Sequence, residues 1–319
     1  PMANCENKAG GDITVSGNII AGRKDNQAGV GVSGVATYYA KSSGSTTDTT
    51  NRGDINFNAS VSMHSEIASN ATYGKINISG VIGYVTGTMS NLKNYGNINI
   101  GSDAGATTII GNGIHIAGIT SLQSKAITTA VNEGNINVHS NVTFDNGITT
   151  DADSALSNTC IGGISAYTSG GARTDVTNKG NITIDGTIKT YGYIGGVGAL
   201  VGGGNCTNIH NSGNLTFNGN CSLYFYYAGL LGRYDGSSIE NSSNSGDVTL
   251  NKLATHSQYV YLGGIAGRSE AAITLKECHN TGVITMAETV TGVFESYTGG
   301  LIGYPNANIT LDNCNTFDC

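Results

Sequence analysis

The sequence predicts an all-β fold, namely a right-handed parallel β-helix solenoid with three strands per coil and about eight coils. Two phrases recur along the chain at intervals typical of stacked supersecondary units, and short alternating apolar segments lie between them. No segment shows convincing helical periodicity over about a dozen residues. Because every repeat supplies apolar residues for a continuous core, the whole chain, 1–319, is expected to form one solenoid.

The first recurring phrase is Asn-x-Gly, followed in most copies by Asn or Asp and then by an apolar-x-apolar strand. Its asparagines are separated by 43, 38, 46, 33, 33 and 36 residues. These anchors are Asn51, Asn94, Asn132, Asn178, Asn211, Asn244 and Asn280. Since Asn tolerates the left-handed region and bonds local backbone, we expect it at a corner of each coil, where stacked amides form a ladder. The glycine after it is expected to supply the conformational freedom of the turn.

The second recurring phrase is a glycine followed by an aliphatic residue that we expect in the core. The reference glycines are Gly29, Gly80, Gly118, Gly163, Gly196, Gly229, Gly264 and Gly300. Those from Gly80 to Gly264 lie 14 to 16 residues before the next anchor, whereas Gly29 lies 22 before it. This phrase is expected to form the second strand of the coil. A third strand, such as Ile273 to Cys278, leads back to the next anchor.

Composition excludes two classes of function. The net charge is −7 with no Lys/Arg cluster, so the chain has no electrostatic footprint for nucleic acid. No apolar run approaches the roughly 18 residues of a membrane span. The chain begins and ends inside repeats, without capping units or a signal peptide, and we therefore expect a segment of a larger surface protein.

The seven cysteines include no CxxC and no zinc-ligand spacing, so neither a metal nor a cofactor is expected. Cys278 and Cys314 lie one repeat apart. Stacked coils would bring their Cα atoms to about 4.8 Å, a separation that a disulfide allows. Two buried thiols at equivalent core positions are the interpretation we prefer.

Searches for catalytic signatures assign no catalytic residue. His210 and His279 share a slot that tolerates many residue types, and neither a nucleophile elbow nor a P-loop occurs. Asp151 and Asp153 lie on an insertion. Asp235 near Arg233 and Glu270 near Arg268 form equivalent pairs one coil apart, which we expect to be exposed ion pairs. Parallel β-helices also carry polysaccharide lyases and glycosidases, and glycosidases need two carboxylates about 5–10 Å apart.

Binding residues are sought among the tyrosines and arginines. Four tyrosines lie three residues before the reference glycine, and strand parity places them with the core aliphatics, as a buried or corner ladder: Tyr193, Tyr226, Tyr261 and Tyr297. The opposite parity, four residues after the glycine, should face solvent. It carries the candidate ligand-binding residues Tyr84, Tyr167, Arg233, Arg268 and Tyr304. Tyr and Arg are preferred at recognition surfaces.

Two long insertions form a second candidate surface. Residues 58–76 and 139–158 exceed the short form of the repeat. Insertions in repeat proteins often map to the binding face. The alternative is a pair of tolerated surface loops.

Four copies of the second phrase resemble the bacterial GLUG repeat, whose hallmark is Gly-Leu-any-Gly. They are Gly229-Leu-Leu-Gly232, Gly300-Leu-Ile-Gly303, Gly264-Ile-Ala-Gly267 and Gly80-Val-Ile-Gly83. The copies at Gly29, Gly118, Gly163 and Gly196 lack the final glycine. The resemblance implies a β-solenoid in a large surface-exposed bacterial protein of the adhesin type, and it transfers no catalytic residue.

Residues and resemblance together predict a non-catalytic structural or adhesion module at the bacterial cell surface. Its expected partner is a surface glycan or a host protein, bound through the exposed Tyr and Arg positions or through the insertions. A carbohydrate-active β-helix enzyme, either a polysaccharide lyase or a glycoside hydrolase, is the alternative.

Overall fold

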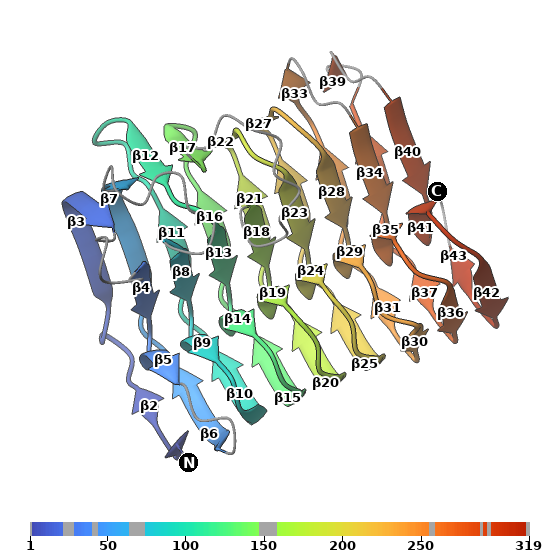
Figure 1. Cartoon of the computed structure of the whole chain (residues 1–319), viewed down its shortest axis with the longest axis horizontal. Coiled ribbons are helices and arrows are strands. Elements are labelled where there is room, and N and C mark those ends of the chain that lie inside the picture. The colour runs from blue at the N-terminus through green and yellow to red at the C-terminus, as the bar shows by residue number, and fades with distance from the viewer. Residues whose placement is uncertain are drawn as a thin grey trace.

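The computed structural model describes residues 2–21, 29–39, 44–63, 74–146, 158–254, 259–287, 290–291 and 295–316. All regular structure in these residues is β-strand, and the recorded strand pairings are parallel. The strands stack into four long sheets that run the length of the molecule (Figure 1). The predicted parallel β-helix is therefore confirmed, whereas its right-handed coiling stays a prediction. The described residues contain no helix long and apolar enough to cross a membrane.

One coil shows how the repeat folds. The chain passes from β20 (Arg173–Asn178) to β21 (Ile182–Ile184) and the short β22 (Thr187–Ile188), and then to β23 (Gly192–Gly195) and β24 (Gly198–Val201). The glycine phrase was expected to be one strand, but it forms two strands that meet at the reference glycine. Each coil therefore contributes to four long sheets instead of three.

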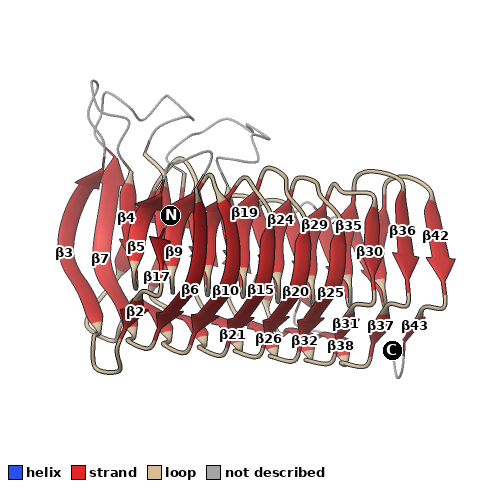
Figure 2. Ribbon diagram, turned by 90° about the horizontal axis from the view of Figure 1, so that it is seen from below, coloured by secondary structure: helices blue, strands red, loops and turns tan. Residues whose placement is uncertain are grey.

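The first sheet ends each coil at its anchor asparagine, and we call it the asparagine sheet. It consists of β1 (Met2–Ala3), β2 (Glu6–Asn7), β6 (Ser45–Asn51), β10 (Thr88–Asn94), β15 (Ile127–Asn132), β20, β25 (Cys206–Asn211), β30 (Ser238–Glu240), β31 (Ser243–Asn244), β36 (Ile273–Lys276), β37 (His279–Asn280), β42 (Ile309–Asp312) and β43 (Asn315–Thr316). Figure 2 shows the longer strands of this sheet lying next to one another.

The second sheet carries the apolar-x-apolar strands, and we call it the isoleucine sheet. It consists of β3 (Ile13–Ala21), β7 (Ile55–Met63), β11 (Ile98–Ile100), β12 (Thr107–Ile110), β16 (Ile136–Val138), β17 (Val142–Asp145), β21, β22, β26 (Leu215–Phe217), β27 (Asn220–Cys221), β32 (Val248–Leu250) and β38 (Ile284–Met286). A short pair, β33 (Leu253–Ala254) and β39 (Val290–Thr291), stands apart from the long sheets.

The glycine phrase supplies the remaining two sheets, each with eight strands. The tyrosine sheet consists of β4 (Val30–Ser33), β8 (Ile76–Ser79), β13 (Ile114–Ala117), β18 (Thr159–Gly162), β23, β28 (Phe225–Ala228), β34 (Tyr259–Gly263) and β40 (Glu295–Gly299). The arginine sheet consists of β5 (Ala36–Tyr39), β9 (Ile82–Val85), β14 (Thr120–Gln123), β19 (Ser165–Thr168), β24, β29 (Leu231–Tyr234), β35 (Ala266–Ser269) and β41 (Ile302–Pro305). Eight stacked strands match the expected number of coils.

The predicted asparagine ladder is present. The ladder starts at Asn7, which pairs with the first anchor in the register, and ends at Asn280. Each Nδ2 donates to the Oδ1 of the asparagine in the next coil at 2.7–2.8 Å. From Asn51 onward the same nitrogen also donates to the carbonyl of the glycine two residues later, as in Asn178 to Gly180 at 2.8 Å. The anchors are buried, so this ladder satisfies amide groups that water cannot reach.

The conformational role assigned to the anchor and its glycine was wrong. No anchor has a positive φ; the left-handed residue lies three positions earlier, as at Asp175 with φ 55°. The glycine after the anchor has no positive φ either. It is needed because of a close approach between coils, since a Cβ on Gly96 would lie 1.9 Å from the carbonyl oxygen of Gly53.

The register of the first glycine phrase also differs from the prediction. Ser33 pairs with Ser79, so Gly34 rather than Gly29 is equivalent to Gly80. A Cβ on Gly34 would lie 2.4 Å from Asn51 Cγ, the contact that defines this position in the other coils. Gly34 lies 17 residues before Asn51, which removes most of the irregular spacing of the first copy.

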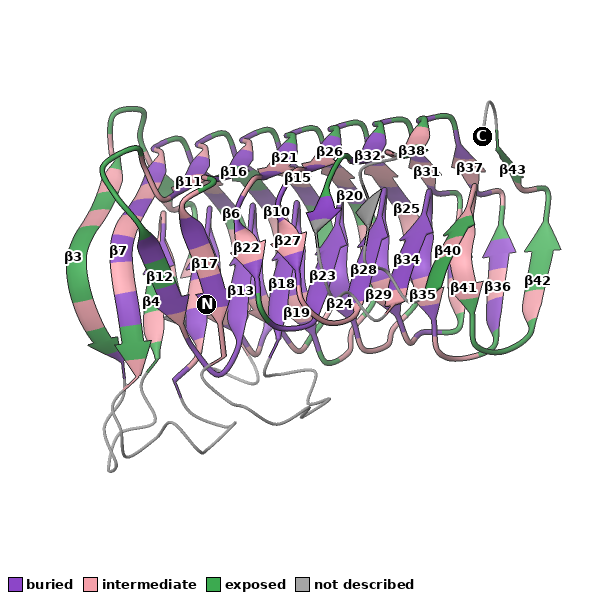
Figure 3. Ribbon diagram, turned by 90° about the horizontal axis from the view of Figure 1, so that it is seen from above, coloured by how far each residue is buried: buried purple, intermediate pink, exposed green. Residues whose placement is uncertain are grey.

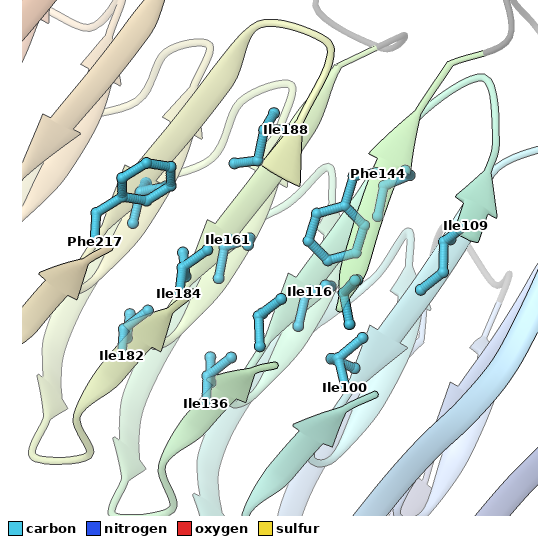
Figure 4. Packing of buried hydrophobic residues seen from close by; sticks show 14 of the residues in the cluster. Ile100, Ile109, Ile116, Ile136, Phe144, Ile161, Ile182, Ile184, Ile188 and Phe217 are labelled. Atoms are coloured by element: carbon cyan, nitrogen blue, oxygen red, sulfur yellow. The ribbon is translucent and has the colours of Figure 1, made fainter. Parts of the chain in front are cut away.

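The coil encloses two apolar cores. The first lies between the isoleucine and tyrosine sheets and contains the apolar pairs of the strands that follow the anchors, such as Ile182 and Ile184 (Figure 4). The second lies between the arginine and asparagine sheets and contains the aliphatic residue after the reference glycine, such as Val197. Burial is most complete in the middle coils and least at β3 and β42 (Figure 3). Met286 stacks on the buried Leu250 in the register but is itself 36% exposed, because β38 is the last strand of its sheet.

Cys278 and Cys314 occupy equivalent positions in neighbouring coils, between the register pairs Lys276–Asp312 and His279–Asn315. Both are free thiols. Cys278 is buried and donates to the Ile239 carbonyl at 3.2 Å, whereas Cys314 is only partly buried. Burial, the largest effect, raises the pKa of the Cys278 thiol to about 12.

Candidate functional site

Two parts of each coil, the anchor asparagine and the reference glycine, come into contact between the two cores. This contact leaves a concave corner on the outside of the coil. The anchor amide lies directly against the reference glycine of the same coil, so that a Cβ on Gly196 would be 2.5 Å from Asn211 Cγ. Only glycine permits this approach. The chain bends at this glycine, so that β23 ends before the bend and β24 begins after it (Figure 1).

The bend turns one set of side chains from each strand towards the corner. In β23, Ile194 belongs to the first core, while its neighbour Tyr193 belongs to a third cluster. In β24, Val201 belongs to the second core and Leu200 to the same third cluster. The outer faces of the tyrosine and arginine sheets therefore share one cluster, which we call the concave corner.

The predicted tyrosine ladder forms one wall of the concave corner. Tyr193 stacks on Tyr226 with ring centroids 4.5 Å apart, and Tyr226 stacks on Tyr261 at 5.0 Å. Tyr261 stacks on Tyr297 at 5.5 Å. The ladder exists, but its placement on the side of the core aliphatics was wrong. The prediction assumed that side chains alternate between inside and outside along the whole glycine phrase, as in one strand. The bend divides the phrase into two strands, and the alternation does not continue across it.

A second tyrosine column was missed from the sequence. Tyr224 stacks on Tyr259 with centroids 4.9 Å apart, and it lies 4.9 Å from Tyr191 in a tilted arrangement. These residues lie two positions before the first column, so they share its strand face. A search for tyrosines at that offset would have found them.

The five outward candidates form the opposite wall. Register places Tyr84, Tyr167, Arg233, Arg268 and Tyr304 in one row that also includes Leu122 and Leu200. They face away from the cores as predicted, but they are half-buried in the concave corner instead of lying on an open surface. The Arg233 and Arg268 side chains are each 18% exposed.

Direct contacts join the two walls. The Arg268 guanidinium lies 5.2 Å from the Tyr261 ring and 5.6 Å from the Tyr304 ring, within the range of cation–π attraction. Its Nη1 donates to the Tyr261 hydroxyl at 3.4 Å. The residues that sequence parity assigned to opposite sides therefore form one surface.

The two Arg–carboxylate pairs are linked across coils. Arg233 Nε lies 3.0 Å from Asp235 and 3.4 Å from Glu270, and Arg268 Nε lies 2.9 Å from Glu270. For Arg233, burial is the largest effect and opposes the charge, but the hydrogen bond and charge of Asp235 outweigh it and raise the guanidinium pKa. The predicted separate, exposed ion pairs are in fact one half-buried network.

A pocket of about 300 Å³ opens where the walls meet. Its lining combines two residues of the second tyrosine column, one of the first, both arginines and one carboxylate: Tyr191, Tyr224, Tyr226, Arg233, Arg268 and Glu270. The lining of this pocket thus offers hydrogen-bond donors and acceptors close to one another.

The corner is closed in the earlier coils. His115 is fully buried, stacks on Tyr167 at 5.8 Å and contacts Asn77 Oδ1 through Nδ1 at 3.1 Å. Desolvation, followed by the charge of Lys75, lowers the His115 pKa to about 3. Cys160 lies between His115 and Tyr193 in the register, and burial raises the pKa of its thiol. These groups are therefore neutral at physiological pH.

A second pocket of about 300 Å³ surrounds the shared histidine slot. His210 contacts Ser243 Oγ at 2.8 Å and Asn208 Oδ1 at 2.6 Å, while His279 contacts Asn315 Oδ1 at 2.6 Å. Both imidazole rings therefore contact polar side chains of the asparagine sheet. Within the described part of the chain, no group of three or more His, Cys, Asp or Glu residues could hold a metal ion.

The insertion candidates are only partly described. Residues 58–63, 74–76, 139–146 and 158 of the two predicted insertions belong to the described ranges. The first insertion begins within the long strand β7, and the second contains β17. Asp151, Asp153 and the remaining insertion residues lie outside the described ranges.

One coil of the solenoid is similar to a known family. Residues 224–249 match the family described as the GLUG motif. No curated protein and no solved structure matches the chain. The matched residues run from the start of β28 into β32 and include Tyr226, Arg233 and Asp235 of the concave corner. The chain thus contains a GLUG motif, as Gly229-Leu-Leu-Gly232 predicted, in a coil with structural equivalents stacked on both sides.

Proposed function

We propose that this solenoid is a non-catalytic recognition module of a bacterial cell-surface protein, and that the concave corner is its binding surface. The observation that carries the proposal is the convergence of two tyrosine columns with Arg233 and Arg268 on one pocket. Tyr and Arg dominate recognition sites because they combine apolar area with directional hydrogen bonds. The GLUG motif in this coil supports a surface location.

The state of the carboxylates supports binding rather than hydrolysis. Asp235 and Glu270 are the acidic groups of the network, and guanidinium nitrogens lie 3.0 and 2.9 Å from them. A general acid or base has to exchange a proton with the substrate. Carboxylates held in charge-assisted bonds are poor candidates for that role. A carbohydrate-active enzyme remains the second candidate, since it would use the same scaffold and the same pocket.

Binding to arrayed glycans and to host-cell surface proteins tests the proposal. The double variant R268A/Y304A removes two neighbouring side chains from the wall that the arginine sheet forms. The matched control is R52A. Arg52 also pairs with a carboxylate, Glu6 at 2.8 Å, and lies 4.5 Å over the Tyr95 ring, but it follows β6 in the turn that leads to β7 and does not belong to the concave corner. We expect the double variant to lose binding and R52A to keep it. Unchanged binding by R268A/Y304A would refute the assignment.

The enzyme alternative needs a separate measurement. Incubation of the protein with the glycans that it binds should release no new reducing ends and no unsaturated products. Release that is abolished by E270Q but not by R52A would establish the carbohydrate-active alternative in its place.

A further inference from the structure

We infer that the ligand of the concave corner is an unbranched, uncharged glycan chain that lies along the solenoid axis. This inference rests on the proposed function and specifies the ligand. Three properties of the corner carry it: the direction of its repetition, its balanced charge and the groups that its tyrosines present.

The corner repeats along one direction only. Equivalent residues recur in successive coils, with tyrosine centroids 4.5, 5.0 and 5.5 Å apart in the first column. The column Tyr191, Tyr224 and Tyr259 runs beside it. A linear polymer laid along this direction meets a tyrosine of each column at successive steps and Arg233 and then Arg268 on the opposite wall, whereas a branched or globular ligand would meet such a row only once. The site therefore selects an extended chain.

The charge of the corner is balanced. Asp235, Arg233, Glu270 and Arg268 alternate in sign, and each neighbouring pair lies within 3.4 Å. An anionic polymer would bring its charges next to two carboxylates as well as two guanidiniums, so it gains no net attraction. Sugar hydroxyls suit the network better, because a hydroxyl accepts from a guanidinium and donates to a carboxylate at the same time.

The stacked tyrosine rings cover one another's faces, so that ring edges and hydroxyl groups are the parts left to meet a ligand. Rings within a column stack almost parallel, with an interplanar angle of 8° between Tyr193 and Tyr226, so each face is covered by its neighbour. Tyr226 and Tyr261 are only 4% exposed. The columns therefore act as rows of phenols with an apolar flank. This combination matches a chain of hydroxyl-bearing rings.

An extended peptide is the other linear ligand to be considered. Peptides are commonly added as a strand to an open sheet edge, where main-chain groups are unpaired. In the corner, β23, β28 and β34 are already paired with both neighbours in the sheet. The backbone groups of these strands are therefore already hydrogen-bonded within the sheet, and a ligand has to be recognised by side chains. This favours the glycan.

The test uses neutral and acidic oligosaccharides of matched length. Malto-, cello- and chito-oligosaccharides of one to six units represent uncharged chains, and hyaluronan and heparin oligomers represent acidic ones. Glycan arrays that also carry other unbranched neutral glycans identify a binder, and titration calorimetry measures it. We expect affinity for a neutral series to rise about tenfold from one to three units. R268A should weaken binding about tenfold or more, and R52A should leave it unchanged.

The outcomes separate the two proposals. The inference is overturned if acidic chains bind more tightly, or if a protein binds and no glycan does. The proposed function still stands in either case if R268A abolishes that binding. An affinity independent of chain length also overturns the inference. Loss of binding that follows unfolding is detected by thermal melting of R268A. The milder variant R268Q, which keeps a polar N–H donor on a shorter side chain and removes the charge, must then weaken neutral binding for the inference to stand.

Discussion

Asn132 lies directly against Gly118: a Cβ on that glycine would be 2.4 Å from the Asn132 side-chain carbon Cγ and 2.2 Å from the Gly163 carbonyl oxygen. The two recurring phrases of the sequence are therefore two halves of one contact. The amide ladder and the glycine bend press together between the two cores, and the outer side of that contact is the concave corner.

Gly118→Ala is expected to lower the free energy of unfolding by about 3 kcal/mol, because backbone and a buried amide have to move apart to accept the methyl group. Gly170→Ala is the matched control, since nothing lies within 4 Å of a Cβ there and its φ is not positive. Urea unfolding followed by circular dichroism measures both. Equal stabilities of the two variants would show that the contact is not tight.

Asn178→Ala tests the ladder. It removes the partner of the Gly180 carbonyl and of Asn211 Oδ1, at about 1–3 kcal/mol for each buried group left unpaired. We expect a clear fall in melting temperature. The control is Asn137→Ala, which breaks an exposed bond of 2.9 Å to Asn99 and should change stability by about 0.5 kcal/mol or less. A fall as large in the control would mean that coil stacking does not depend on buried amides.

Arg173→Ile is expected to stabilise the protein. Arg173 is fully buried in the second core, its Nε has no hydrogen-bond partner, and no described carboxylate pairs with it. Its register neighbours in adjacent coils are Ile127 and Cys206. Replacing a buried charge with an apolar side chain of suitable volume gains about 1–4 kcal/mol in favourable cases. A lower melting temperature would instead indicate that the hydrogen bonds from Arg173 to Thr168 and to the Gly171 carbonyl hold the turn between β19 and β20 together.

Stability should fall with acidification below pH 6.5, in part because of His115. Its pKa is lowered to about 3 in the folded protein, against about 6.5 in an unfolded chain. The unfolded state therefore binds a proton first, so the contribution of neutral His115 is present above pH 6.5 and is lost as pH falls towards 3. The expected slope is up to about 1.4 kcal/mol per pH unit. His115→Asn introduces the residue type that the neighbouring coil has at the paired position, Asn77. This variant should flatten the dependence of stability on pH. Superimposable profiles would contradict the buried neutral state.

The repeat made most of the fold predictable. Regular spacing of Asn51 to Asn280 fixed the coil, the ladder and the inward residues, since each follows from local pattern alone. The bend at Gly196 could not be found this way, because a close approach between Asn211 and that glycine is a tertiary contact. Parity counted across the bend separated Tyr261 from Arg268, and only the structure brings them together. The register of Gly34 was missed for the same reason, as strand pairing sets it.

A crystal structure of the protein with a bound neutral hexasaccharide tests the central claim most directly, namely that the bend makes both walls into one binding surface. The account predicts sugar units running along the coils, in contact with Tyr226 on one wall and with Arg268 on the other. A saccharide bound elsewhere, for example over the pocket near Asn99 and Asp185 on the isoleucine sheet, would contradict it.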